Sequence, residues 1–203
     1  QKVCGDFQAL IKYGNVETNM QDFLDKAIEL EALKFGSFKL KSGMESDYFF
    51  NIAAFFDSES LSFLADCYVS KILDLKIDFD LFFGPAYKGI PLASVVATKY
   101  FEVTKKNIPL AFDRKEEKSH GEGGIIMGNL EGKRALLIDD VLTAGTAIKN
   151  SIEIIENNNG TFVGALVALD REEPYDSDKT FQEFYAEQGI KIHSIAKISE
   201  LKK

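Results

Sequence analysis

From residue 79 onward, short apolar runs alternate with stretches whose apolar residues recur at helical spacing. Four of the apolar runs have the length of buried strands. They span residues 79–84, 108–112, 135–140 and 163–169. Helical spacing follows at residues 91–100 and again beyond the third run, where Ile148, Ile152 and Ile155 share one face. Strands that alternate with helices are typical of a parallel sheet with helices on both faces. We therefore predict an α/β fold with a central parallel sheet.

The first third of the chain has a different pattern. Residues 20–33 and 61–75 have the spacing of amphipathic helices. Residues 35–43 alternate between polar and apolar, and residues 48–51 form a second short run, so we predict a small antiparallel pair of strands. Residues 1–19 fit no strong pattern and are treated as an extension of unknown role. Because the sequence has no internal repeat and no Pro/Ser-rich linker, the whole chain is predicted to form a single domain.

Composition and charge narrow the class of protein. The chain has 203 residues and a formal net charge of −8, which argues against general nucleic-acid binding because that needs a basic surface. Small anionic ligands remain possible, since they need only a local cluster of cations. No apolar run reaches the roughly 18–20 residues that span a bilayer, and residues 1–6 lack the pattern of a secretory signal. The two cysteines, Cys4 and Cys67, have no metal-like spacing. We expect a cytoplasmic protein with reduced thiols.

The segment from Leu136 to Ala147 carries the strongest candidate chemistry. Its sequence is Leu-Leu-Ile-Asp-Asp-Val-Leu-Thr-Ala-Gly-Thr-Ala, so a buried strand ends in Asp139 and Asp140 and a loop of small residues opens a helix. Backbone N–H groups at a helix start, unobstructed near Gly145, form an anion site that the helix dipole strengthens. Two adjacent carboxylates accept hydrogen bonds from a sugar diol, so a ribose 5-phosphate pocket is the functional interpretation. The alternatives are acids that cap the turn and helix, or a pair that binds a metal or accepts a phosphoryl group.

Two further segments place positive charge near the ends of predicted strands. Residues 84–91 combine Lys88 with small residues that let the backbone approach an anion. A plain connection between strand and helix is the structural alternative there. Residues 112–124 end in a glycine-rich stretch, and they hold four basic side chains within seven positions, which are Arg114, Lys115, Lys118 and His120. The functional interpretation is a positively charged lid that closes over a polyanionic leaving group and excludes water. The alternative is a solvated charged hairpin.

Together these segments resemble the type I phosphoribosyltransferases over roughly residues 20–200. The acidic run resembles the family's signature for phosphoribosyl pyrophosphate, and residues 84–91 resemble its pyrophosphate loop. For that loop the resemblance implies a non-proline cis peptide between Ala86 and Tyr87. It also implies a small hood with antiparallel strands, formed by about residues 20–60 and the C-terminal end. The residues that the resemblance assigns to phosphoribosyl pyrophosphate are Lys41, Tyr87, Lys88, Arg114, Lys115, Lys118, His120, Asp139, Asp140, Val141, Leu142, Thr143, Ala144, Gly145, Thr146 and Ala147.

The charged segment, residues 33–43 and two shorter matches resemble the orotate phosphoribosyltransferases in particular. The resemblance places Phe49, Phe50, Thr143 and Arg171 at orotate-binding positions. An arginine fork matches a carboxylate bidentately, and orotate carries a carboxylate whereas uracil and the purine bases do not. The structural alternatives are core packing of the two phenylalanines and pairing of the arginine with a glutamate that follows it. Ser119 and Glu117 depart from the family's pattern in the charged loop, but neither change removes a cation.

The resemblance implies transfer of the 5-phosphoribosyl group from phosphoribosyl pyrophosphate to orotate, which gives orotidine 5'-monophosphate and pyrophosphate. It further implies Mg²⁺ as cofactor, held mainly through substrate and water without a direct protein ligand. A homodimer is implied as well, in which the charged loop reaches the partner's site. The residues expected to act in catalysis are Lys88, Lys115, Lys118, His120, Asp139 and Asp140.

Two rival functions remain at this point. The first is a phosphoribosyltransferase for another base, against which Arg171 and the charged loop argue. The second is a regulator that keeps the fold to sense phosphoribosyl pyrophosphate, against which the retained loop and the acidic net charge argue. Because the sequence stops shortly after Leu201, we expect no fused decarboxylase.

Overall fold

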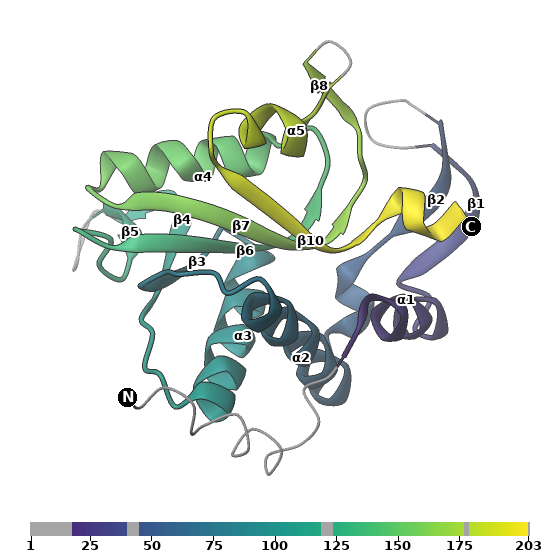
Figure 1. Cartoon of the computed structure of the whole chain (residues 1–203), viewed down its shortest axis with the longest axis horizontal. Coiled ribbons are helices and arrows are strands. Elements are labelled where there is room, and N and C mark those ends of the chain that lie inside the picture. Colours follow the sequence, from purple (N-terminus) through teal and green to yellow (C-terminus); the bar gives the residue numbers. More distant parts are fainter. Residues whose placement is uncertain (1–17, 40–44, 119–123, 177–178, 203) are drawn as a thin grey trace, which may run out of the picture.

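All four predicted apolar runs form strands of one central sheet, as Figure 1 shows. The computed structural model describes residues 18–39, 45–118, 124–176 and 179–202. The sheet has six strands in the order β10-β7-β6-β3-β4-β5, in which β5 is antiparallel to β4 and the other neighbours are parallel. The strands are β3 (Leu81–Gly84), β4 (Leu110–Lys118), β5 (Gly124–Met127), β6 (Arg134–Leu142), β7 (Thr161–Asp170) and β10 (Lys191–Lys197). The expected parallel sheet is confirmed.

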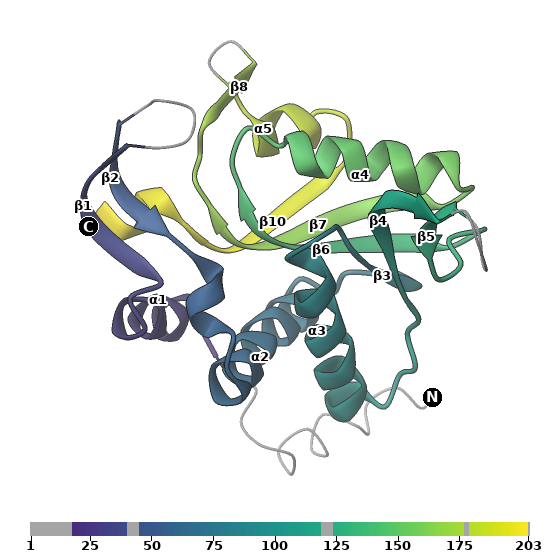
Figure 2. The ribbon, with the colours of Figure 1, turned by 180° about the vertical axis from the view of Figure 1, so that it is seen from behind.

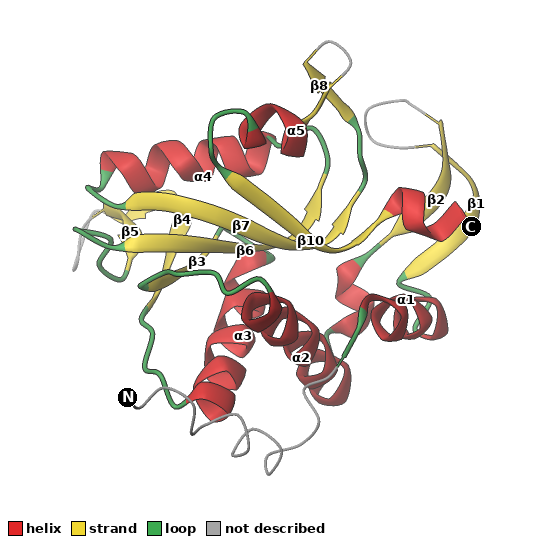
Figure 3. Ribbon diagram, viewed as in Figure 1, coloured by secondary structure: helices red, strands yellow, loops and turns green. Residues whose placement is uncertain are grey.

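Helices cover both faces of this sheet (Figure 3). Alternate residues of β6 pack into different cores, since side chains of a strand point to opposite faces. Leu136 and Ile138 belong to the core under α2 and α3, while Ala135 and Leu137 belong to the core under α4 and α5. The helices are α2 (Ser58–Asp74), α3 (Gly89–Thr104), α4 (Thr146–Asn157) and α5 (Phe181–Ala186). Across the described ranges, no helix is both long and apolar enough to traverse a bilayer.

The N-terminal elements and the C-terminal turn lie side by side beyond one end of the sheet, as Figures 1 and 2 agree. We call this group the hood. Asn19 and Asp22 form a capping box that starts its helix. Phe23 of that helix stacks on Phe55 with ring centroids 5.9 Å apart, and both belong to the core that includes the sheet. The elements of the hood are α1 (Met20–Glu29), β1 (Leu33–Lys39), β2 (Glu45–Phe50), η2 (Ile52–Phe55) and η3 (Ile198–Lys202), and β1 and β2 are antiparallel.

Several elements differ from the sequence prediction. Helix α1 ends at Glu29 rather than near residue 33, because Glu31 adopts a left-handed φ of 54° and the chain then enters β1. Strand β4 begins at Leu110 and continues to Lys118, so part of the predicted charged lid is strand. It pairs with β5 and forms an antiparallel hairpin. Helix α5, strand β10 and the two-stranded sheet of β8 (Pro174–Asp176) and β9 (Lys179–Thr180) were not predicted.

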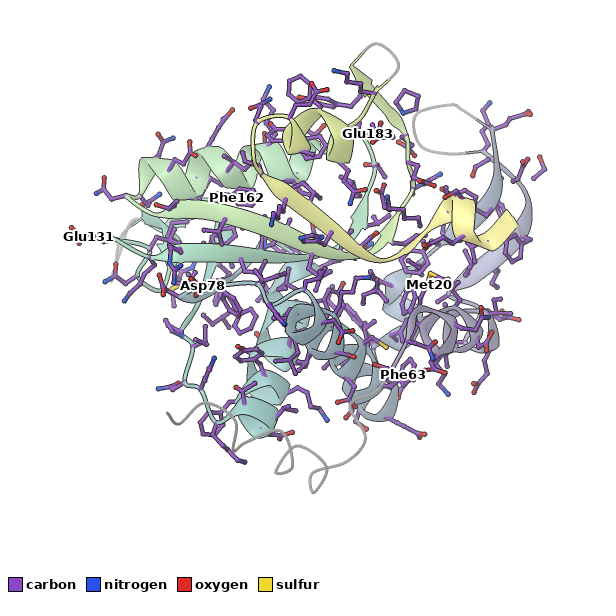
Figure 4. All side chains as sticks on the ribbon, in the orientation of Figure 1. Met20, Phe63, Asp78, Glu131, Phe162 and Glu183 are labelled. Atoms are coloured by element: carbon purple, nitrogen blue, oxygen red, sulfur yellow. The ribbon has the colours of Figure 1, made fainter. Side chains whose placement is uncertain are left out.

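The amino-terminal edge of the sheet is held by one arginine. Arg134 begins β6, and its guanidinium donates to both oxygens of Asp80 and to Asp78, at distances between 2.5 and 3.1 Å. Figure 4 shows Asp78 and Glu131 at this end of the molecule, far from Met20 in the hood. The cationic side chain of Arg134 is therefore committed to structure, and the candidate chemistry lies at the opposite edge of the sheet.

Candidate active site

The loops that follow β3 and β6, together with Asp113 of β4, border a cavity of about 530 Å³ at the carboxyl-terminal edge of the sheet. Ligands of parallel sheets bind at this edge because every parallel strand ends there. The cavity is lined by Pro85 and Ala86, by Asp113, by residues 141–143 and by the first turns of α4 from Gly145 onward. The structure thus brings together two segments that the sequence analysis selected separately.

Asp139 and Asp140 end the buried part of β6, and both side chains are nearly inaccessible to solvent. The backbone N–H of Asp140 donates to Oδ1 of Asp139 at 2.9 Å. Burial, together with the neighbouring charge of Asp140, raises the pKa of Asp139 to about 7. The hydroxyl of Tyr68, a fully buried residue of α2, donates to the backbone carbonyl of Asp139 at 2.7 Å. The position of the acid pair is therefore fixed by contacts with the core.

Lys88 provides a positive charge beside this pair. Its Nζ donates to Oδ2 of Asp140 at 2.8 Å, while about half of the lysine side chain remains exposed. The loop before it contains the predicted cis peptide between Ala86 and Tyr87, which is confirmed. The N–H of Ala86 donates to Oδ1 of Asp113, which in β4 directly follows the last residue paired with β3, at 2.7 Å. The loop is thereby attached to two strands, and it presents backbone and ammonium groups at their ends.

The loop of residues 143–147 surrounds the start of α4. Gly145 is the N-cap with a φ of 75°, and as a glycine it has no side chain with which to cap the first turn. The amides of that turn thus remain suited to an anion. A Cβ at Gly145 would lie 1.9 Å from the ring of Phe181 in α5, so that ring fills the space which a side chain would need. Thr146 and Ala147 are exposed, and Leu142 is buried in the core.

Arg171 follows the end of β7 and connects the sheet to the hood. Its backbone N–H donates to the carbonyl of Leu142, at the end of β6, at 2.9 Å. Its side chain is 14% exposed and pairs with Glu173 at 3.0 Å. Nε donates to the hydroxyl of Tyr48 in β2 at 2.9 Å, and the guanidinium lies 4.9 Å from the centre of that ring. The backbone of Arg171 thus binds a residue that lines the cavity, while its side chain is held by β2 and Glu173.

The other described residues that the sequence analysis selected do not line the cavity. Phe49 is 42% exposed and lies 5.7 Å from Phe38, whereas Phe50 points to the opposite face of β2 and packs against Phe23. The side chain of Tyr87 is 65% exposed. The guanidinium of Arg114 contacts the sulfur of Met127 in β5. The predicted residues Lys41 and His120 lie outside the described residues, as do the side chains of Lys115 and Lys118 on β4.

Sequence reasoning missed several residues that shape the site. Asp113, Tyr68 and Tyr48 all bind residues that the sequence analysis selected, but each does so across 27 to 123 positions of chain. For Asp113 a signal was present, because it follows the second apolar run and so had to lie at the same sheet edge. No comparable signal marked the two tyrosines, since both have the pattern of core residues.

Comparison with known proteins finds extensive similarity. The family model of the phosphoribosyl transferase domain matches residues 55–194. This range includes the whole central sheet except the end of β10 and leaves out most of the hood. Orotate phosphoribosyltransferase 2 of Saccharomyces cerevisiae is 52% identical over 163 residues, 78% of this chain and 72% of the yeast protein. The orotate phosphoribosyltransferase of Salmonella agona is 43% identical over 182 residues, 89% of this chain and 85% of that protein. The crystal structure of orotate phosphoribosyltransferase from Francisella tularensis superimposes with a TM-score of 0.78 at 36% identity, covering 88% of this chain and 87% of that one.

Replacement of Gly145 by alanine tests the packing of the α4 loop. Gly132 is the matched control, because it also has a positive φ of 66° but nothing lies within 4 Å of an added Cβ. We expect Gly132→Ala to lose roughly 1–2 kcal/mol from backbone strain alone, and Gly145→Ala to lose about 1–3 kcal/mol more from overpacking. Urea denaturation measures both. Equal losses in the two variants would contradict the account of Phe181.

The raised pKa of Asp139 predicts a pH-dependent stability. In the unfolded chain an aspartate has a pKa of about 4, so between that pH and about 7 the folded protein binds a proton that the unfolded chain has lost. The stability contributed by this proton is lost as the pH rises through that window. The free energy of unfolding of Asp139→Asn, relative to the unchanged protein, should therefore increase from pH 4 toward pH 7, by about 1.4 kcal/mol for each pKa unit of the shift. Denaturant titrations at several pH values measure the difference, and a constant difference would refute the prediction.

Proposed function

Since the chain belongs to the orotate phosphoribosyltransferase family, we infer that it transfers the 5-phosphoribosyl group from phosphoribosyl pyrophosphate to orotate. The products are orotidine 5'-monophosphate and pyrophosphate, in the synthesis of pyrimidine nucleotides. The observation that carries the assignment of the base is Arg171, whose guanidinium is only 14% exposed and whose backbone N–H binds the carbonyl of Leu142 in the cavity lining. Such a group favours a planar carboxylate. Orotate has one, and uracil and the purine bases do not.

We propose that the sugar phosphate binds at the start of α4. The 5'-phosphate would accept hydrogen bonds from the amides of residues 143–147 and from the hydroxyls of Thr143 and Thr146, with support from the helix dipole. Asp139 and Asp140 would accept hydrogen bonds from the ribose hydroxyls. Val141 and Leu142 would contribute backbone groups to the floor of the pocket. The support for this arrangement is that the acid pair directly precedes Val141 to Thr143, which line one cavity together with the helix start.

The diphosphate would lie against the loop of Tyr87 and Lys88. Lys88 pairs with Asp140 in the described structure, so we propose that it shifts toward the diphosphate when the acid turns to the ribose. Arg114, Lys115, Lys118, His120 and Lys41 would add cations. As N1 of orotate attacks the anomeric carbon, negative charge grows on the departing pyrophosphate. No protein nucleophile is needed, and catalysis rests on positioning and on stabilisation of this charge.

The base would lie between the end of β7 and the hood. Arg171 would bind the carboxylate of orotate, and Thr143 would line the same side of the pocket. We propose that Phe49 and Phe50 contribute through their strand, since their side chains point to opposite faces. The hydrogen bond between Arg171 and Tyr48 supports this arrangement because it joins the arginine to the same strand.

Mg²⁺ is the cofactor that the family implies. Among the described residues, no group of three or more histidine, cysteine, aspartate or glutamate side chains is arranged to hold a metal. Mg²⁺ prefers oxygen ligands and keeps several waters, so we propose that it is held mainly by substrate oxygens and water, without a direct protein ligand. When bound, it would neutralise charge on the diphosphate. We also propose a cytosolic location, because Cys67 is a free thiol and a reducing compartment keeps thiols in that state.

We propose a homodimer in which each subunit's basic segment, residues 112–124, completes the site of its partner. Strand β4 carries Arg114, Lys115 and Lys118 away from the cavity edge toward the hairpin with β5. Charges on such an extended hairpin are well placed to act on a neighbouring molecule. A two-fold axis would make the exchange of the two segments reciprocal.

Loss of the arginine fork should abolish orotate use. We expect Arg171→Ala to lower kcat/KM for orotate by roughly 10²–10³-fold, the usual effect of removing one partner of a buried charged pair. The decrease in orotate absorbance with phosphoribosyl pyrophosphate and Mg²⁺ measures turnover. Uracil and hypoxanthine serve as control bases and should not react with the unchanged protein. Undiminished orotate turnover by the variant, or none by the unchanged protein, would defeat the assignment.

The shared loop predicts complementation between two inactive variants. Lys118→Ala removes a loop cation and Arg171→Ala removes the base contact, so each homodimer is impaired. In a mixed dimer, one site combines the intact loop of one subunit with the intact pocket of the other. After random reassociation we expect roughly a quarter of the normal activity per subunit. If the loop acted within its own subunit, mixing would restore nothing.

A further inference from the structure

Three groups hold the guanidinium of Arg171 on one side. Nε donates to the Tyr48 hydroxyl at 2.9 Å, Nη2 donates to Oγ of Ser46 at 3.4 Å, and Oε1 of Glu173 lies 3.0 Å from Nε. The ring of Tyr48 also lies against the cation. Among the described residues, Nη1 has no hydrogen-bond partner. The Nε side of the fork is thus occupied by protein, and the terminal edge is left for a ligand.

The chain around Arg171 is fixed so firmly that Glu173 has little freedom to be elsewhere. Asp170 is 1% exposed, and its Oδ1 accepts from the N–H of Glu172 at 2.8 Å. Glu172 adopts a φ of 52°, and its Oε2 accepts from the N–H of Ser199 in the hood at 2.8 Å. These contacts fix the backbone directly after Arg171. The carboxylate of Glu173, itself only 22% exposed, lies against the arginine two positions earlier.

We propose that Glu173 is a positioning residue that determines specificity for orotate. Its carboxylate fixes the Nε side of Arg171, so that Nη1 and Nη2 form the edge which receives the orotate carboxylate. A guanidinium has five donors in one plane, so an acid on the Nε side orients the terminal edge without occupying it. Holding the long side chain in advance also lowers the conformational cost of binding. The inference rests on the proposed function, because it concerns the same contact with the base.

A matched pair of nucleotides isolates this contact. Orotidine 5'-monophosphate and uridine 5'-monophosphate share the ribose phosphate, and only the first carries the carboxylate. Isothermal titration of the whole protein measures both affinities without turnover. We expect Glu173→Ala to weaken orotidine 5'-monophosphate by up to about tenfold, the cost of immobilising one long side chain that is no longer held in advance, and to leave uridine 5'-monophosphate unchanged. Glu173→Gln keeps the side-chain size and one acceptor oxygen, so a smaller loss of about threefold is expected.

Steady-state kinetics give a second readout. The KM for orotate should rise in both variants, while kcat and the KM for phosphoribosyl pyrophosphate stay the same, a split that general destabilisation does not produce. Glu131→Gln is the control, because it makes the same charge change on an exposed residue at the opposite edge of the sheet and should alter nothing.

Two outcomes would overturn the positioning role. Glu173→Ala could bind orotidine 5'-monophosphate as tightly as the unchanged protein or more tightly, in which case Glu173 competes with the substrate. Alternatively, both nucleotides could weaken equally, in which case the change is structural. A failure of the proposed function is distinguishable, because then the unchanged protein would itself bind the two nucleotides alike.

Discussion

The parallel pairing of β3, β4, β6 and β7 is the constraint on which the rest of the structure depends. Parallel strands end at the same edge, so residues separated by more than eighty positions, from Ala86 to Arg171, come to border one region. The opposite edge is closed by the pairing of Arg134 with two aspartates. The ion pairs that stabilise the sheet therefore lie at the amino-terminal ends of the strands. The polar groups of the candidate site lie in the loops at the carboxyl-terminal ends.

The pKa of Asp139 at that edge depends on burial as well as on neighbouring charges. Desolvation makes two adjacent acids costly, and the raised pKa of Asp139 expresses that cost. One lysine offsets it through Asp140, while three other candidate cations, Arg114, Lys115 and Lys118, belong to β4. The acid pair and one cation are thus in direct contact at this edge. A chain of net charge −8 can bind a polyanion in this way because only the local field matters.

The sequence predicted the central sheet and the candidate site segments after β3 and β6. It did not predict contacts between residues that lie far apart in the chain. Buried strands such as β6 are continuous apolar runs, and the loop after it has a specific composition, so both could be predicted. The extension of β4 to Lys118 could not, because its charged residues are held by pairing with β5 rather than by their own propensity. Strand β10 was missed since its polar residues His193 and Ser194 interrupt the apolar pattern. The contact of Tyr48 with Arg171 depends on tertiary structure alone.

The hydrogen bond from Tyr68 to the carbonyl of Asp139 has a consequence for redesign. The phenol of Tyr68 in α2 binds the backbone of β6 at Asp139. A shift of α2 in the core would therefore also move Asp139 and Asp140 at the site. Efforts to accept a different base would do well to alter the hood and the end of β7. Repacking of α2 would instead displace Asp139 and Asp140, to which we assign the ribose in the proposed function.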